Sequence, residues 1–153
     1  MARILYLEDE AWQVQSTVIT FIEKELGHTV SLVKSTAEAR ESLSTTPYDA
    51  VFLDIMLNEK GLIEFEDSGL LIAQLILAGE FAAAGNPATL PIVVASGNWD
   101  ATVRDSMGRG WTVEDRARSL GISHKRFLRK PFLADEVRDI LHNVLEDQGK
   151  GRA

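Results

Sequence analysis

Five short apolar runs, each followed by a segment of helical or mixed character, constrain this chain of 153 residues more than any other feature. The runs predict strands over residues 3–7, 28–33, 50–53, 92–96 and 126–130. The intervening spacing predicts helices over 11–26, from Ser35, over 69–84 and from Pro131, whereas 98–119 shows only weak helical pieces. Such alternation predicts an α/β fold, a doubly wound five-stranded parallel sheet in which the βα unit is repeated five times.

Chemically useful side chains gather where these strands end, and ligands of such sheets bind beyond the carboxyl ends of the strands. The residues at those ends are Glu8, Asp9 and Glu10, then Asp54, Ser96 and Lys130. Carboxylates held close together repel each other unless a cation joins them, and hard oxygen ligands suit Mg²⁺. With a hydroxyl and an ammonium to bind phosphoryl oxygens, Asp54 is the candidate nucleophile toward phosphorus.

Composition excludes several classes of function. Lys plus Arg is 16 and Asp plus Glu is 23, so the net charge of −7 disfavours a nucleic-acid partner. There is no cysteine, which rules out disulfides, thiolate metal sites and thiol catalysis. Too few apolar residues stand together for a signal peptide or for a membrane span of roughly 18 residues. We therefore expect a cytoplasmic protein with no membrane contact.

Four segments carry a resemblance to a known family. "ILYLEDE", "YDAVFLDIML", "PIVVASGN" and "FLRKPF" resemble, in the right order, the signatures of the response regulator receiver domain of two-component signalling, whose fold is flavodoxin-like. Each segment is a weak signal singly, but together they span Ile4 to about Leu145. The resemblance predicts a receiver domain over 1–147 and a disordered tail over 148–153. Because nothing remains after the fifth helix for an output domain, we expect a stand-alone receiver.

The resemblance implies a phosphorylation site and a metal site. Asp54 would accept a phosphoryl group from a histidine kinase or a phosphotransfer protein in a Mg²⁺-dependent reaction. Asp9 and Asp54 would bind Mg²⁺ directly, Glu8 would act largely through bound water, and the backbone carbonyl of Met56 would supply another ligand. The protein would assist its own phosphorylation and dephosphorylation without being a turnover enzyme.

Four further residues have roles that the resemblance implies. Ser96 and Lys130 would bind the phosphoryl oxygens, and Pro131 would hold the peptide geometry that aims Lys130. Ser96 and Phe127 would form the switch that moves on activation. The output would be contact with an unidentified downstream protein, a homodimer being one form of such contact.

Departures from the family pattern surround this site. Glu8 stands where aspartate is commoner, and Asn58 stands where proline is usual. The loops 58–68 and 98–124 are longer than usual, and the first of them is acidic. The choice of partner and the lifetime of the phosphoryl group are therefore open.

Two other functions stay open at this stage. The segment 116–130, "RARSLGISHKRFLRK", also resembles a helix-turn-helix DNA-binding unit, although Pro131 would cut its second helix short. An extended conformation of 126–129 would contradict that reading. The other alternative is a receiver-like interaction domain that is never phosphorylated.

Overall fold

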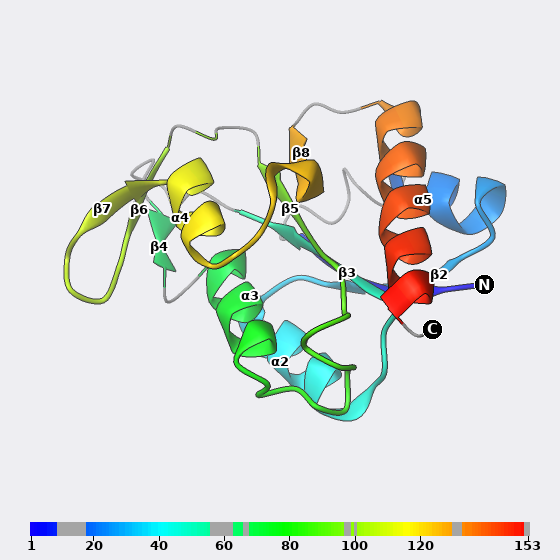
Figure 1. Cartoon of the computed structure of the whole chain (residues 1–153), viewed down its shortest axis with the longest axis horizontal. Helices are drawn as coiled ribbons and strands as arrows, with labels where there is room; N and C mark the ends of the chain where they lie inside the picture. Colours follow the sequence, from blue (N-terminus) through cyan, green and yellow to red (C-terminus); the bar gives the residue numbers. More distant parts are fainter. Residues whose placement is uncertain are drawn as a thin grey trace.

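A computed structural model of the chain describes residues 1–8, 18–55, 63–65, 68–96, 99, 101–129 and 133–151. Its main sheet holds five parallel strands in the order β2-β1-β3-β5-β8 (Figure 1). Their bounds are Arg3–Leu7 (β1), Thr29–Val33 (β2), Ala50–Asp54 (β3), Ile92–Ser96 (β5) and Phe127–Arg129 (β8). The predicted doubly wound α/β sheet is confirmed.

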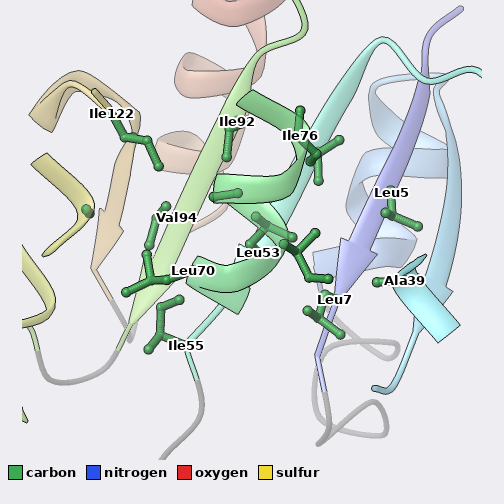
Figure 2. Close-up of a cluster of buried hydrophobic side chains, with 14 of the residues drawn as sticks. Leu5, Leu7, Ala39, Leu53, Ile55, Leu70, Ile76, Ile92, Val94 and Ile122 are labelled. Atoms are coloured by element: carbon green, nitrogen blue, oxygen red, sulfur yellow. The ribbon is translucent and has the colours of Figure 1, made fainter. Parts of the chain in front are cut away.

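Helices cover both faces of this sheet. The bounds of the covering helices are Phe21–Glu25 (η2), Thr36–Thr45 (α2), Gly69–Leu77 (α3) and Ala134–Gly151 (α5). Successive strand residues point to opposite faces, so Ile4 packs with η2 and α5 while Leu5 packs with α2 and α3. Figure 2 shows side chains of the second of these two clusters, including Leu53, Leu70 and Val94. Burial on both faces explains why the strands read as continuous apolar runs.

Local signals place several helix ends correctly. The Oγ of Ser35 accepts a hydrogen bond from the backbone N–H of Glu38 (3.1 Å), as expected of a helix cap. Gly27, the predicted stop of the first helix, has a φ of 76°, a conformation that glycine adopts without strain. Of the predicted helix over 11–26, residues 11–17 lie outside the described residues.

Two helices have bounds that differ from those the sequence suggests. The predicted helix over 69–84 is wrong at its end, because α3 stops at Leu77 and turns follow to Ala84. Gly79 has a φ of 84° and its N–H donates to the carbonyl of Ile76 (3.0 Å), which closes the helix. At the carboxyl end, α5 runs to Gly151, into the segment 148–153 predicted to be disordered. Among the described residues, no helix is both long and apolar enough to cross a lipid bilayer.

A second, three-stranded sheet is formed by the two enlarged loops. Its strands are Ile63–Glu64 (β4), Thr102–Arg104 (β6) and Gly110–Thr112 (β7), in the order β4-β6-β7 (Figure 1). Ile63 pairs with Val103, 40 residues further along the chain, and Val103 pairs with Trp111 across a hairpin. A helix, α4 (Val113–Ser119), follows β7 directly. Among the described residues of 98–119, the weak helical pattern therefore corresponds to a helix only in α4. The strands β6 and β7 are too short to show the periodicity of a strand.

The last strand removes one alternative function. After a short 3-10 turn, η4 (His124–Arg126), the chain is extended in β8, where Phe127 pairs with Val94 and Arg129 with Ser96. A recognition helix running through 116–130 is incompatible with this pairing. The helix-turn-helix interpretation of 116–130 is therefore wrong.

The β6–β7 hairpin is closed by the carboxylate of Asp105. One oxygen accepts from the backbone N–H groups of Met107 (3.0 Å) and Arg109 (2.9 Å), and the other accepts from the indole Nε1–H of Trp111 (3.1 Å). The hydrogen bond from Trp111 and then that from Arg109 lower the pKa of Asp105 below its ordinary value. The hairpin therefore depends on the ionised form of this residue.

We predict that the hairpin weakens in acid. The folded-state pKa of Asp105 is depressed, so its contribution is complete above the unfolded pKa of about 3.9 and is lost as the pH falls through the folded value. Amide hydrogen exchange of Met107 and Arg109 should therefore accelerate, relative to that of α5 amides, as the pH falls below about 4. In Asp105→Asn this extra acid sensitivity should be absent. Equal pH profiles for wild type and variant would contradict the prediction.

Candidate functional site

Two carboxylates lie side by side at the carboxyl end of the main sheet. The parallel register pairs Leu7 with Leu53, so the next residues of the two chains, Glu8 and Asp54, are neighbours. On the other side of β3, Asp54 pairs with Ala95, and Ser96 is the following residue. Glu8, Asp54 and Ser96 expose only 2%, 3% and 2% of their surface. The structure thus brings two acids and a hydroxyl to one end of three neighbouring strands.

Four residues expected at this site lie outside the described residues. These are Asp9, Met56, Lys130 and Pro131. In the sequence, three of them directly follow described residues: Asp9 follows Glu8, Met56 follows Ile55 and Lys130 follows Arg129 of β8. Their roles stay predictions.

The donor set of the site suits a small hard cation. Burying an ionised carboxylate is costly unless it is paired or coordinates a metal, and here two are buried together. Carboxylate oxygens are preferred ligands of Mg²⁺, which usually keeps several waters and takes only one or two carboxylates from the protein. Within the described part of the chain no group of three or more metal-binding side chains occurs. Glu8 and Asp54 therefore fit Mg²⁺ as two members of a ligand set completed by neighbouring groups and water.

Tyr6 is a neighbour of this site that sequence reasoning missed. Its ring is fully buried and stacks on Phe52, with ring centroids 5.4 Å apart. Burial, then the charge of Asp54, then that of Glu8 raise the pKa of the Tyr6 phenol far above its usual range. The hydroxyl is therefore protonated at any ordinary pH. The one signal in the sequence was the phenol oxygen of Tyr6 inside the otherwise apolar run "ILYL".

The amino terminus of α3 packs directly behind Asp54. Ser68 caps this helix: its Oγ accepts from the N–H of Leu70 (3.2 Å) and donates to the carbonyl of Phe65 (2.9 Å). A Cβ atom on Gly69 would lie 2.8 Å from the carbonyl oxygen of Asp54 and 3.2 Å from the Cβ of Leu53. Glycine is thus required for this close approach of helix to strand.

The predicted switch aromatic, Phe127, is covered by a tryptophan. The ring of Trp99 stacks on Phe127 with centroids 4.3 Å apart and planes at 27°, and the guanidinium of Arg129 lies 5.4 Å from the Trp99 ring centre. The backbone carbonyl of Trp99 accepts from the N–H of Glu114 in the first turn of α4 (3.2 Å). Trp99 therefore contacts β8 through its ring and α4 through its backbone.

The two enlarged loops are joined by a cation held between aromatic rings. The guanidinium of Arg116, on α4, lies 4.5 Å from the ring centre of Phe65 and 5.1 Å from that of Trp111. Such cation–π contacts are worth about 0.5–2 kcal/mol each. Phe65 comes from the first loop and Trp111 from the second, so this arrangement stabilises their association beside the site.

Solved structures that match this fold include receiver domains. A response regulator receiver domain protein from Methanospirillum hungatei JF-1 matches with a TM-score of 0.70 and 13% identity, covering 99% of this chain and 98% of that one. The receiver domain of a sensor histidine kinase from Pseudomonas aeruginosa PAO1, which holds a magnesium ion in its active site cleft, matches with a TM-score of 0.65 and 26% identity. That match covers 95% of this chain and 98% of the other.

A third solved structure, the signal receiver domain of a putative LuxO repressor from Vibrio parahaemolyticus, gives a TM-score of 0.69 at 16% identity, covering 99% and 95% of the two chains. No family model and no curated protein matches the chain. The structural matches confirm the predicted resemblance to the receiver domains of two-component signalling at the level of the fold.

Replacing Gly69 by alanine tests the approach of α3 to Asp54. We expect Gly69→Ala to lower the free energy of unfolding by about 1–3 kcal/mol, because the helix must move away from the Asp54 carbonyl. Urea unfolding measures the change. The matched control is Gly110→Ala, whose new Cβ would meet only the Cγ2 of Thr102 at 3.3 Å and should leave stability within about 1 kcal/mol of wild type. Equal effects of the two substitutions would contradict the packing argument.

Proposed function

We propose that this chain, which has the receiver fold of two-component signalling, accepts a phosphoryl group on Asp54 and signals by contact with other proteins. The donor would be a histidine kinase or a phosphotransfer protein, which places the protein in the cytoplasm. The observation that carries the proposal is the pair of buried carboxylates, Glu8 and Asp54, at the ends of adjacent strands with Ser96 on the next strand.

The transfer would combine the described side chains of Asp54 and Ser96 with Lys130 and a bound cation. A carboxylate oxygen of Asp54 attacks phosphorus, the new P–O bond forms, and the P–N bond of the donor phosphohistidine breaks with its electron pair going to the imidazole nitrogen. The hydroxyl of Ser96 would donate to a phosphoryl oxygen. As the resemblance implies, Lys130 would balance the negative charge and Pro131 would hold the peptide geometry that aims it.

Glu8 and Asp54, with Asp9 and the Met56 carbonyl as the resemblance implies, would hold Mg²⁺. When bound, this ion neutralises the charge shared by the carboxylates and the incoming phosphoryl oxygens. A set of acidic side chains without a cation would instead repel the phosphoryl group. The reaction should therefore depend on Mg²⁺.

The conformational change caused by phosphorylation would pass from Ser96 to α4, the helix that follows β7 of the second sheet. Ser96 pairs with Arg129 across β5 and β8, and Arg129 lies over the Trp99 ring that stacks on Phe127. A shift of Ser96 toward a phosphoryl oxygen would disturb this stack and, through the bond from Glu114 to the Trp99 carbonyl, the position of α4. The partner that reads this change would be a downstream protein or a second copy of the chain.

Phosphorylation is tested by weighing the intact protein after incubation with a small-molecule phosphoryl donor and Mg²⁺. The wild type should gain the mass of one phosphoryl group, and Asp54→Asn should gain none. Removal of Mg²⁺ by a chelator should abolish the gain.

The matched control for this experiment is Asp49→Asn, which changes a carboxylate near the other end of the same strand, bonded to the N–H of Arg3 (2.9 Å). This variant should be labelled like wild type. Equal labelling of Asp54→Asn and wild type would show that Asp54 is not the acceptor. No labelling of a folded wild type would favour an interaction domain that is never phosphorylated.

Tryptophan fluorescence tests the output route. Phosphorylation should change the emission of the wild type and of Trp111→Phe, because both keep Trp99 in contact with Phe127 and Arg129. The change should disappear in Trp99→Phe, while mass labelling continues. A signal that survives in Trp99→Phe and disappears in Trp111→Phe would show that the stack is not the reporter.

A further inference from the structure

A fully buried hydroxyl without a hydrogen-bond partner lies beside the acidic site. Tyr6 has no exposed surface, and its hydroxyl has no hydrogen-bond partner among the described residues. Buried polar groups are nearly always hydrogen-bonded, because leaving one unpaired costs free energy. Phenylalanine would stack on Phe52 equally well and would bring no such cost. The hydroxyl therefore needs an explanation other than packing.

The register of the sheet places this hydroxyl on the same face as the two carboxylates. Tyr6 pairs with Phe52 across β1 and β3, and each is followed two residues later by an acid, Glu8 and Asp54 respectively. Side chains two apart on a strand share a face. Both carboxylates also act on the phenol electrostatically, Asp54 more strongly than Glu8. The hydrogen-bond acceptors that this placement offers to the Tyr6 hydroxyl are thus the oxygens of these two acids and any water that they bind.

We propose that Tyr6 is a positioning residue of the phosphoacceptor site, whose hydroxyl donates a hydrogen bond to a water that it shares with the carboxylates of Glu8 and Asp54. This inference rests on the proposed function. A protonated phenol can only donate to an ionised carboxylate, directly or through water, so it holds the two acids in the charged, oriented form that binds a cation and attacks phosphorus. The water supplies the partner that the described residues do not.

The test compares the chain's only two tyrosines, each changed to phenylalanine. Tyr48 is also buried, with 5% of its surface exposed, but its hydroxyl is hydrogen-bonded to the Oγ of Ser42. In Tyr6→Phe we expect Mg²⁺ affinity, measured by titration calorimetry, and the rate of phosphoryl mass gain each to fall about tenfold, the effect of one lost hydrogen bond to a charged group. Its urea midpoint without metal should stay close to that of wild type, because the ring keeps its stacking on Phe52.

Tyr48→Phe should show the reverse pattern, with a lower urea midpoint but wild-type Mg²⁺ affinity and labelling rate. Wild-type affinity and rate in Tyr6→Phe would overturn the inference while leaving the proposed function intact. If the wild type is never labelled, the proposed function fails. The calorimetric comparison of wild type with Tyr6→Phe still decides the role of Tyr6. Equal Mg²⁺ affinity of these two proteins overturns the inference, and a tenfold lower affinity of Tyr6→Phe supports it.

Discussion

Burial of the parallel sheet on both faces is the constraint on which the rest of this structure depends. Strands covered by η2 and α5 on one side and by α2 and α3 on the other have no solvent face for charged side chains. Charged groups can therefore stand only where strands end, and the register of β1 with β3 makes Glu8 and Asp54 neighbours there. Two carboxylates almost without exposed surface are costly to bury unless other groups pair with them or a cation binds them, and the proposed function uses both acids as cation ligands. The fold and the proposed chemistry thus have one physical cause.

The enlarged loops extend the core of the domain. Ile63 of β4, Val103 of β6 and Val113 of α4 belong to the same buried cluster as Val51 and Val94 of the main sheet. Arg116 lies between one ring from each loop. Because these loops share a core with β3 and β5, a change at the acidic end of those strands can reach them through packed side chains. This gives the second sheet a physical basis for a role in output.

The two faces of the sheet offer different surroundings to the site. On the face of η2 and α5, Tyr6 is buried and the charges of Asp54 and Glu8 act on its phenol. On the face of α3 and α4, Trp99 stacks on Phe127 and joins β8 to α4. The proposed chemistry at Asp54 and the proposed transmission of the signal would therefore use different sets of side chains, which substitutions can alter separately.

Local sequence patterns were enough to predict the five main strands, the Ser35 cap, the stop at Gly27 and the residues that follow each strand. These features depend on periodicity and turn chemistry within a few neighbouring residues. Contacts between distant segments were needed to define the end of α3, the second sheet and the place of the Tyr6 hydroxyl. A strand of two or three residues such as β4 has no readable period, and its partner Val103 lies 40 residues away. Likewise, Tyr6 comes close to Asp54 only through the register of β1 with β3, two strands that are distant in sequence, and no local pattern encodes that register.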